Sequence, residues 1–151
     1  SKCDIANIQE IFAADTKLAI PDPVYPVYVD TNVMAGNTGE ADERGAYAGL
    51  MYLPCNAANH FVADVPSGKA DLIYLCFPNN PTGALYSDEL LGEIIKLARQ
   101  HNLVIFADEV YDKVLYEEVQ HTPIGSLSEE CQTSIIRSSD FIEQIGGAGG
   151  I

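Results

Sequence analysis

Residues 72–77 read LIYLCF and residues 103–107 read LVIFA, and these two apolar runs decide the fold. Pro78 ends the first run and Asp108 ends the second. Continuous apolar runs of this length, bounded by turn signals, are typical of strands that are buried on both faces of a parallel sheet. Between them Ser87 can cap a helix. The inner face of that helix would consist of Leu90, Leu91, Ile94, Ile95 and Ala98. A strand, a helix and a strand at this spacing predict a βαβ unit, and therefore an α/β fold whose mainly parallel sheet is flanked by helices.

The patterns nearer the N-terminus are weaker. Asp4 is a good N-cap residue, and we expect a first helix to begin there. The other expected elements are a short strand over 17–20, a turn over 21–23, an extended segment over 24–31, an exposed loop over 36–49 and a short strand over 51–53.

The charge balance argues against two classes of partner. Acidic residues outnumber basic ones by 22 to 8, the net charge is −14, and the basic residues are scattered along the chain. Neither a nucleic acid nor an anionic membrane surface suits such a protein. Apolar residues make up 47% of the chain, yet no run approaches the ~20 residues of a membrane span, and no signal peptide is visible. We expect a cytoplasmic protein, or one of an organelle stroma if the source is a plant.

The four cysteines, Cys3, Cys55, Cys76 and Cys131, include no C-x-x-C pair. Together with the three histidines they form no spacing that is typical of a metal site. We therefore expect reduced thiols and no bound metal.

Polar residues follow each of the two buried strands. Ligands of open α/β sheets bind outside the carboxyl ends of the strands, and the sequence there is NNPTG over 79–83 and DEVY over 108–111. Taken singly, Asn80 could simply make a turn. Asp108 could be an ordinary strand-end carboxylate or the second acidic motif of a nucleotide hydrolase. The chain contains no G-x-x-x-x-G-K-[ST] phosphate loop, which disfavours the nucleotide hydrolase.

These two motifs, about thirty residues apart, resemble those of the class I/II (fold-type I) aminotransferases, which depend on pyridoxal phosphate (PLP). Residues 1–83 resemble LL-diaminopimelate aminotransferase, on KCDI at 2–5 and DPVYPVYVD at 22–30. Residues 85–128 resemble the bacterial alanine (glutamate–pyruvate) aminotransferases instead. The resemblance implies a partial PLP-binding large domain over 1–131. Residues 132–151 form a tail unlike the family that ends in a glycine-rich segment.

The resemblance also implies which residues hold the cofactor ring. Asp108 would keep the ring nitrogen protonated, because a carboxylate favours the charged pyridinium. Asn80 and Tyr111 would donate hydrogen bonds to the phenolic oxygen, and Tyr25 would pack on the face of the ring. We expect Asn80, Asp108 and Tyr111 to meet in one pocket at the ends of adjacent strands.

Two further residues are implied for the cofactor phosphate. Ser1 and Lys2 would lie at the N-terminus of the first helix, where unpaired amides attract anions. Lys2, Tyr25 and Asn80 would also contact the substrate.

One residue of the family pattern is missing. The lysine that forms the Schiff base and moves the substrate proton lies about 33 residues beyond the aspartate in the family. Counting from Asp108 reaches Phe141, which follows two serines at 138 and 139, and Lys113 is the last lysine of the chain. No catalytic residue is therefore assigned.

The resemblance implies amino-group transfer between an amino acid and a 2-oxo acid. It also implies a homodimer and, for the LL-diaminopimelate enzyme, a role in lysine biosynthesis. Because the lysine is absent, we expect an incomplete chain of such an enzyme. The alternative is an inactive fragment that at most binds PLP without a covalent bond. A fragment, a truncated reading frame, a frameshift or a chimera would each give this sequence.

Overall fold

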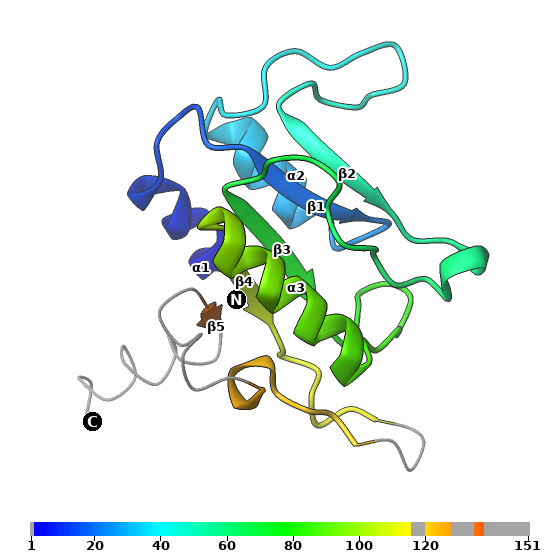
Figure 1. Ribbon diagram of the computed structural model, residues 1–151. Helices are drawn as coiled ribbons and strands as arrows, with labels where there is room; N and C mark the ends of the chain where they lie inside the picture. Colours follow the sequence, from blue (N-terminus) through cyan, green and yellow to red (C-terminus); the bar gives the residue numbers. More distant parts are fainter. Residues whose placement is uncertain (1, 116–119, 128–134, 138–151) are drawn as a thin grey trace, which may run out of the picture.

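The computed structural model describes residues 2–115, 120–127 and 135–137 (Figure 1). In chain order its elements are α1 (Lys2–Asn7), the 3-10 turn η1 (Ile8–Ile11), β1 (Leu18–Asp22), α2 (Val27–Met34), β2 (Leu50–Pro54), η2 (Ala57–Asn59), β3 (Leu72–Cys76), α3 (Asp88–His101), β4 (Val104–Asp108), η3 (Ile124–Ser126) and β5 (Ile135–Arg137).

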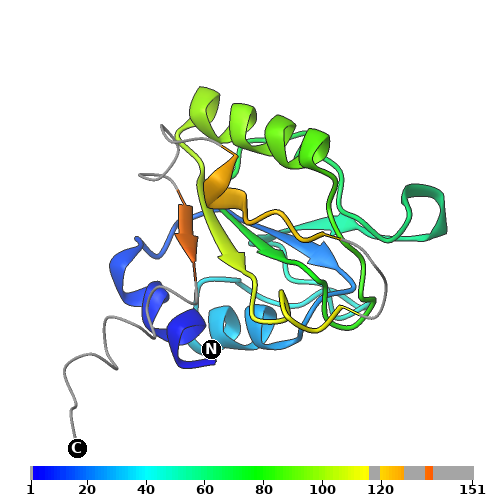
Figure 2. The ribbon, with the colours of Figure 1, turned by 90° about the horizontal axis from the view of Figure 1, so that it is seen from below.

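The strands form one parallel sheet in the order β2-β1-β3-β4-β5. Figure 2 shows three layers, with α3 on one face of the sheet and α1 and α2 on the other. Alternate residues of a strand point to opposite faces, and two separate hydrophobic clusters result. The α3-side cluster includes Ile73, Leu75 and Ile105, and the α2-side cluster includes Tyr74 and Phe106. The predicted α/β fold is confirmed.

The βαβ unit forms as its sequence predicts. β3 and β4 pair in parallel from Leu72 with Val104 to Cys76 with Asp108, and all five residues of β3 are buried. The Ser87 side chain accepts a hydrogen bond from the Leu90 backbone amide at 3.2 Å and so caps α3. The expected inner face of α3 is buried except for Leu90, which is partly buried against the same cluster.

The first helix and the segment after β1 differ from the expectations. α1 begins at Lys2, which places Asp4 in its first turn and not at the N-cap. Residues 21 and 22, expected in a turn, belong to β1, where Pro21 lies beside Leu53 of β2. β1 pairs with β3 only through its first two residues. Pro21 lies beyond these pairs, so its missing backbone amide costs no hydrogen bond to β3.

The expected extended segment over 24–31 is wrong, because residues 27–34 form α2. Pro26 is its N-cap residue, and the fixed φ of proline suits the start of a helix. Tyr28 and Asn32, four residues apart, are both fully buried. Packing of this face against the sheet therefore outweighs the strand preference of the Val and Tyr residues.

The 36–49 loop and a short strand after it are present, although the strand is longer than expected at Leu50–Pro54. Most of the predicted tail lies outside the described residues; within it, residues 135–137 form β5 beside β4. The proposed boundary at 131 therefore stays a prediction.

Candidate functional site

A cavity of about 180 Å³ lies at the carboxyl ends of β3 and β4. Its lining residues are Ile5, Tyr25, Cys76, Asn80, Asp108, Val110 and Tyr111. Cys76 and Asp108 are the last residues of two paired strands and stand side by side at its floor. The cavity is smaller than the ~300–1,000 Å³ of a complete ligand site.

Asp108 is the buried charge of this cavity, with only 5% of its surface exposed. Its Oδ2 accepts a hydrogen bond from the Tyr28 hydroxyl at 2.6 Å, between residues that lie 80 positions apart in the chain. The Tyr28 ring stacks on Tyr74 at a centroid distance of 5.0 Å, and the Tyr28 carbonyl accepts from Asn32 Nδ2 at 2.7 Å. A buried carboxylate is costly without such donors, so Tyr28 both orients Asp108 and stabilises its charge.

Burial dominates the proton equilibria beside Asp108. Burial raises the pKa of the Cys76 thiol to about 11, and the Asp108 carboxylate adds to this effect. Burial also raises the pKa of Tyr28 far above its usual range, with smaller contributions from Cys76 and Asp108. Both groups are therefore protonated at neutral pH. Asp108 thus has two neutral neighbours, of which Tyr28 donates a hydrogen bond to it.

The turn after β3 places Asn80 at the rim. The Asn79 amide donates to the Ala84 carbonyl at 2.9 Å and the Gly83 amide donates to the Asn79 carbonyl at 2.7 Å. Gly83 has φ +73°, which a side chain disfavours. The Asn79 side chain donates to the Pro23 carbonyl at 3.1 Å. This bond ties the turn to the segment that leads into Tyr25.

The structure thus brings four of the six predicted cofactor residues together, namely Tyr25, Asn80, Asp108 and Tyr111. Ser1 lies outside the described residues. Lys2 is the first residue of α1, and only its backbone is described. The cofactor and substrate roles of all six residues stay predictions.

The sequence alone does not identify Tyr28, Cys76, Ile5 and Val110 as residues of the site. The spacing of Tyr25 and Tyr28 carries a usable signal, since residues three apart share a face in a helix. An extended segment over 24–31 hides that signal, because residues three apart in a strand point to opposite faces. Cys76 lies two residues after Tyr74, which places both on the same face of β3.

No lysine is among the described residues that line the cavity. The Lys113 side chain is 89% exposed and its Nζ lies 3.2 Å from Asp112 Oδ2. Lys113 therefore does not reach into the cavity.

Two other kinds of feature are absent from the described part of the chain. None of its helices has the length and apolar character needed to cross a membrane. Among the same residues no group of His, Cys, Asp and Glu side chains is placed to hold a metal ion.

Residues 6–139 match the family model described as aminotransferase class I and II. The structure is also similar to that of L,L-diaminopimelate aminotransferase from Chlamydomonas reinhardtii. The two share 37% identity with a TM-score of 0.82, over 91% of this chain and 34% of the algal one.

An aminotransferase from Escherichia coli is 32% identical with a TM-score of 0.68, over 83% of this chain and 30% of the bacterial one. A protein of Clostridium difficile 630, solved in a PLP-bound form, shares the fold at 22% identity and a TM-score of 0.69, over 90% of this chain and 34% of that one. This chain spans about a third of the length of these solved proteins.

Proposed function

The chain belongs to the class I and II aminotransferase family, and we propose from this that it forms the ring-binding part of a PLP site. The whole enzyme would move an amino group between an amino acid and a 2-oxo acid. The chain spans about a third of its solved relatives, so the activity of a complete enzyme needs groups that lie outside it.

The observation that carries the proposal is the buried Asp108 carboxylate at the floor of a cavity walled by Tyr25, Asn80 and Tyr111. The donor set fits PLP, which supplies an electron sink for bonds at the substrate α-carbon when it is bound. Asp108 would hold the proton on the ring nitrogen, since a nearby carboxylate favours the charged form. Asn80 and Tyr111 would donate to the phenolic oxygen. Tyr25 would cover one face of the ring.

Tyr28 would keep the Asp108 carboxylate in one orientation. Its bond to Oδ2 is short at 2.6 Å, as hydrogen bonds to ionised acceptors are. A fixed carboxylate needs no reorganisation when charge develops on a bound ring, which is the general advantage of a preorganised site.

The second candidate is a chain that binds PLP without a covalent bond and has no turnover of its own. It is favoured by the absence of lysine beyond Lys113 and by the exposed position of Lys113 itself. No lysine that could carry the substrate proton is among the described residues of the cavity. A positioned base typically contributes ~10²–10⁴-fold to a rate.

The substrate that we propose for the whole enzyme is LL-diaminopimelate, with alanine or glutamate as the alternative. The similarity to the algal diaminopimelate enzyme at 37% identity supports the first choice. It would place the enzyme in lysine biosynthesis. Cys3, Cys55 and Cys76 are unbridged thiols, which suits the reducing cytoplasm or a stroma.

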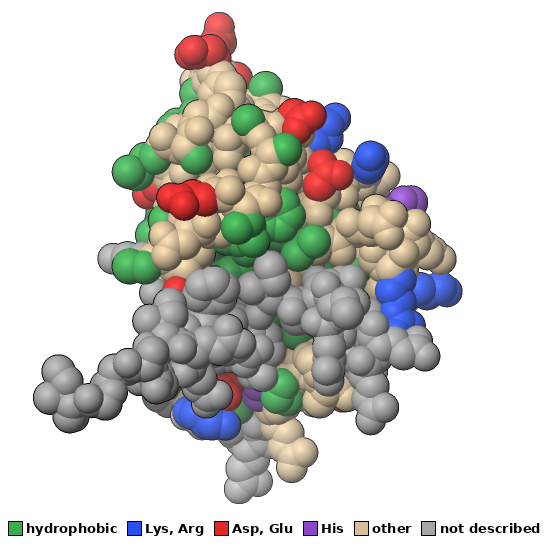
Figure 3. Space-filling view, turned by 90° about the vertical axis from the view of Figure 1, so that its left-hand side faces the viewer, with side chains coloured by type: hydrophobic (Ala, Val, Ile, Leu, Met, Phe, Trp, Pro, Cys, Tyr) green, Lys and Arg blue, Asp and Glu red, His purple; other side chains and the backbone are tan. Residues whose placement is uncertain are grey.

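We further propose that the protein pairs with a second copy of itself. Hydrophobic side chains gather on the face that carries α1 (Figure 3). Ile11 is 71% exposed and Met34 is 86% exposed, and exposed apolar side chains that gather in a patch mark an interaction site. Sedimentation should show self-association, and a compact monomer at high concentration would contradict it.

The proposed function is tested by titrating the protein with PLP. We expect saturable binding that Asp108→Ala weakens by at least about tenfold, since the lost interaction involves a buried charge. Asp112→Ala is the matched control, because this residue lies four positions away and its carboxylate pairs with the exposed Lys113. Equal binding by the wild type and Asp108→Ala would refute the site. Borohydride reduction and peptide mapping should find no uniquely labelled lysine.

A further inference from the structure

Asp108 and Glu109 are consecutive acidic residues, and both are buried, at 5% and 3% exposure. Their side chains accept hydrogen bonds on opposite faces of the sheet. Asp108 receives the Tyr28 hydroxyl on the α2 side, whereas Glu109 accepts from the Ile124 backbone amide at 2.8 Å. Ile124 is fully buried in the α3-side cluster. The end of β4 is therefore fastened to both layers by two adjacent carboxylates.

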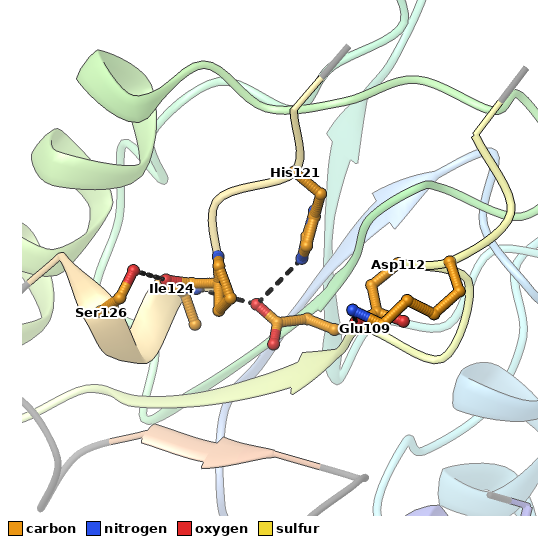
Figure 4. A network of polar contacts seen from close by, with 7 residues as sticks. Glu109, Asp112, His121, Ile124 and Ser126 are labelled. Atoms are coloured by element: carbon orange, nitrogen blue, oxygen red, sulfur yellow. Dashed lines mark hydrogen bonds and ion pairs between the residues drawn. The ribbon is translucent and has the colours of Figure 1, made fainter. Parts of the chain in front are cut away.

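The surroundings of Glu109 are closed and mostly apolar. Figure 4 shows its carboxylate pointing toward Ile124 and His121, which come from the 120–127 segment. His121 Nε2 lies 3.7 Å from Glu109 Oε1, and the His121 ring lies 5.3 Å from Phe77. A carboxylate in such a place is retained only with hydrogen-bond donors. The Ile124 amide is a donor that the backbone fixes in position.

The same residue begins the turn that carries two lining residues of the cavity. The Asp112 amide donates to the Glu109 carbonyl at 3.1 Å, and the Val114 amide donates to the Tyr111 carbonyl at 2.9 Å. Val110 and Tyr111 are 43% and 39% exposed. Packing alone holds these two side chains weakly, so their placement depends on the anchored start of the turn.

We propose that Glu109 is a positioning residue, which holds Val110 and Tyr111 at the rim of the cavity by anchoring the end of β4 to the Ile124 amide. The part of this inference that concerns cofactor binding rests on the proposed function. The part that concerns the turn does not.

Two substitutions of Glu109 distinguish anchoring by an acceptor oxygen from a requirement for negative charge at this position. Glu109→Gln keeps an oxygen at the same distance and loses the charge. Glu109→Asp keeps the charge but is one methylene shorter, so it falls short of the Ile124 amide. Both changes are small enough to retain the fold. Anchoring by an acceptor oxygen therefore predicts that Gln is the better replacement.

The first readout is hydrogen exchange of the backbone amides of Ile124 and of residues 110–114. We expect Glu109→Asp to speed this exchange by about tenfold or more, while Glu109→Gln stays within about threefold of the wild type. The amides of β3 should be unchanged in both. Asp112→Asn, which removes a neighbouring surface carboxylate, should match the wild type. Exchange that is unchanged in Glu109→Asp, or faster in Glu109→Gln than in Glu109→Asp, would overturn the proposal.

The second readout is the dissociation constant for PLP itself. We expect Glu109→Asp to weaken binding by about tenfold, and Glu109→Gln to restore most of it. Binding that ranks Asp above Gln would overturn the role at the cavity. If the wild type does not bind PLP, the proposed function fails, and the exchange measurement still decides whether Glu109 anchors the turn.

Discussion

Replacing Tyr28 by Phe removes one hydroxyl from the interior and leaves the ring in place. The stack on Tyr74 is retained, and the lost interaction is the 2.6 Å hydrogen bond to the buried Asp108 carboxylate. Hydrogen bonds to charged groups contribute about 1.5–3 kcal/mol, and an under-satisfied buried charge puts the cost in the upper part of that range. We therefore expect the free energy of unfolding to fall by about 2–3 kcal/mol.

The assay is urea denaturation at neutral pH, followed by far-UV circular dichroism. Tyr25→Phe, which removes a hydroxyl from a half-buried neighbour on the cavity wall, should cost less than about 0.5 kcal/mol. A double-mutant cycle with Asp108→Asn isolates the pair, and we expect a coupling energy of about 1 kcal/mol or more. A Tyr28→Phe variant as stable as Tyr25→Phe, or an equal loss in the Asp108→Asn background, would show that the hydrogen bond does not stabilise the site.

Three other predictions concern stability and activity. The pKa of the Cys76 thiol is raised from 9.0 to about 11 in the folded protein. As pH rises, the unfolded chain therefore loses this proton before the folded protein does. The free energy of unfolding should fall as pH rises from about 9 to 11. Cys76→Ser should flatten that fall by about 1 kcal/mol per pH unit, whereas Cys3→Ser, at an exposed thiol, should not; parallel curves for the two variants would contradict the assignment. Gly83→Ala, at φ +73°, should destabilise the protein by about 1 kcal/mol, whereas Gly92→Ala on the open face of α3 should stabilise it by a similar amount. Melting temperatures of the two variants that are both above or both below that of the wild type would refute this. With PLP, 2-oxoglutarate and either alanine or LL-diaminopimelate, the 151-residue chain should show no turnover above that of PLP alone, because it lacks the proton-carrying lysine. Turnover that Asp108→Ala abolishes would show that another residue supplies the base.

The βαβ unit could be predicted from the sequence because every local signal agrees with the tertiary structure. The 72–77 and 103–107 runs are long enough for buried strands, and Ser87 stands where a cap is needed. The residues after those strands could be predicted as neighbours, since the carboxyl ends of parallel strands meet at one edge of a sheet. The meeting of Asn80, Asp108 and Tyr111 in one cavity follows from that geometry.

The α2 segment could not be predicted in the same way. Its Val and Tyr residues favour a strand, and eight residues are too few for helix propensity to decide the outcome. The deciding interactions are tertiary, namely the burial of Tyr28 and Asn32 and the bond to Asp108. The bond between Glu109 and the Ile124 amide was equally out of reach, because one partner is a backbone group fifteen residues away.

The crystal structure of this protein with PLP tests the central claim most directly. The ring nitrogen should lie within about 3 Å of the Asp108 carboxylate, with Tyr25 against one face of the ring and the Tyr111 hydroxyl at the phenolic oxygen. Electron density should show no covalent bond from the cofactor to a lysine of the chain. PLP bound elsewhere, for instance in the cavity that Lys17 and Lys69 line at the opposite end of β1, with the Asp108 cavity empty, would contradict the account.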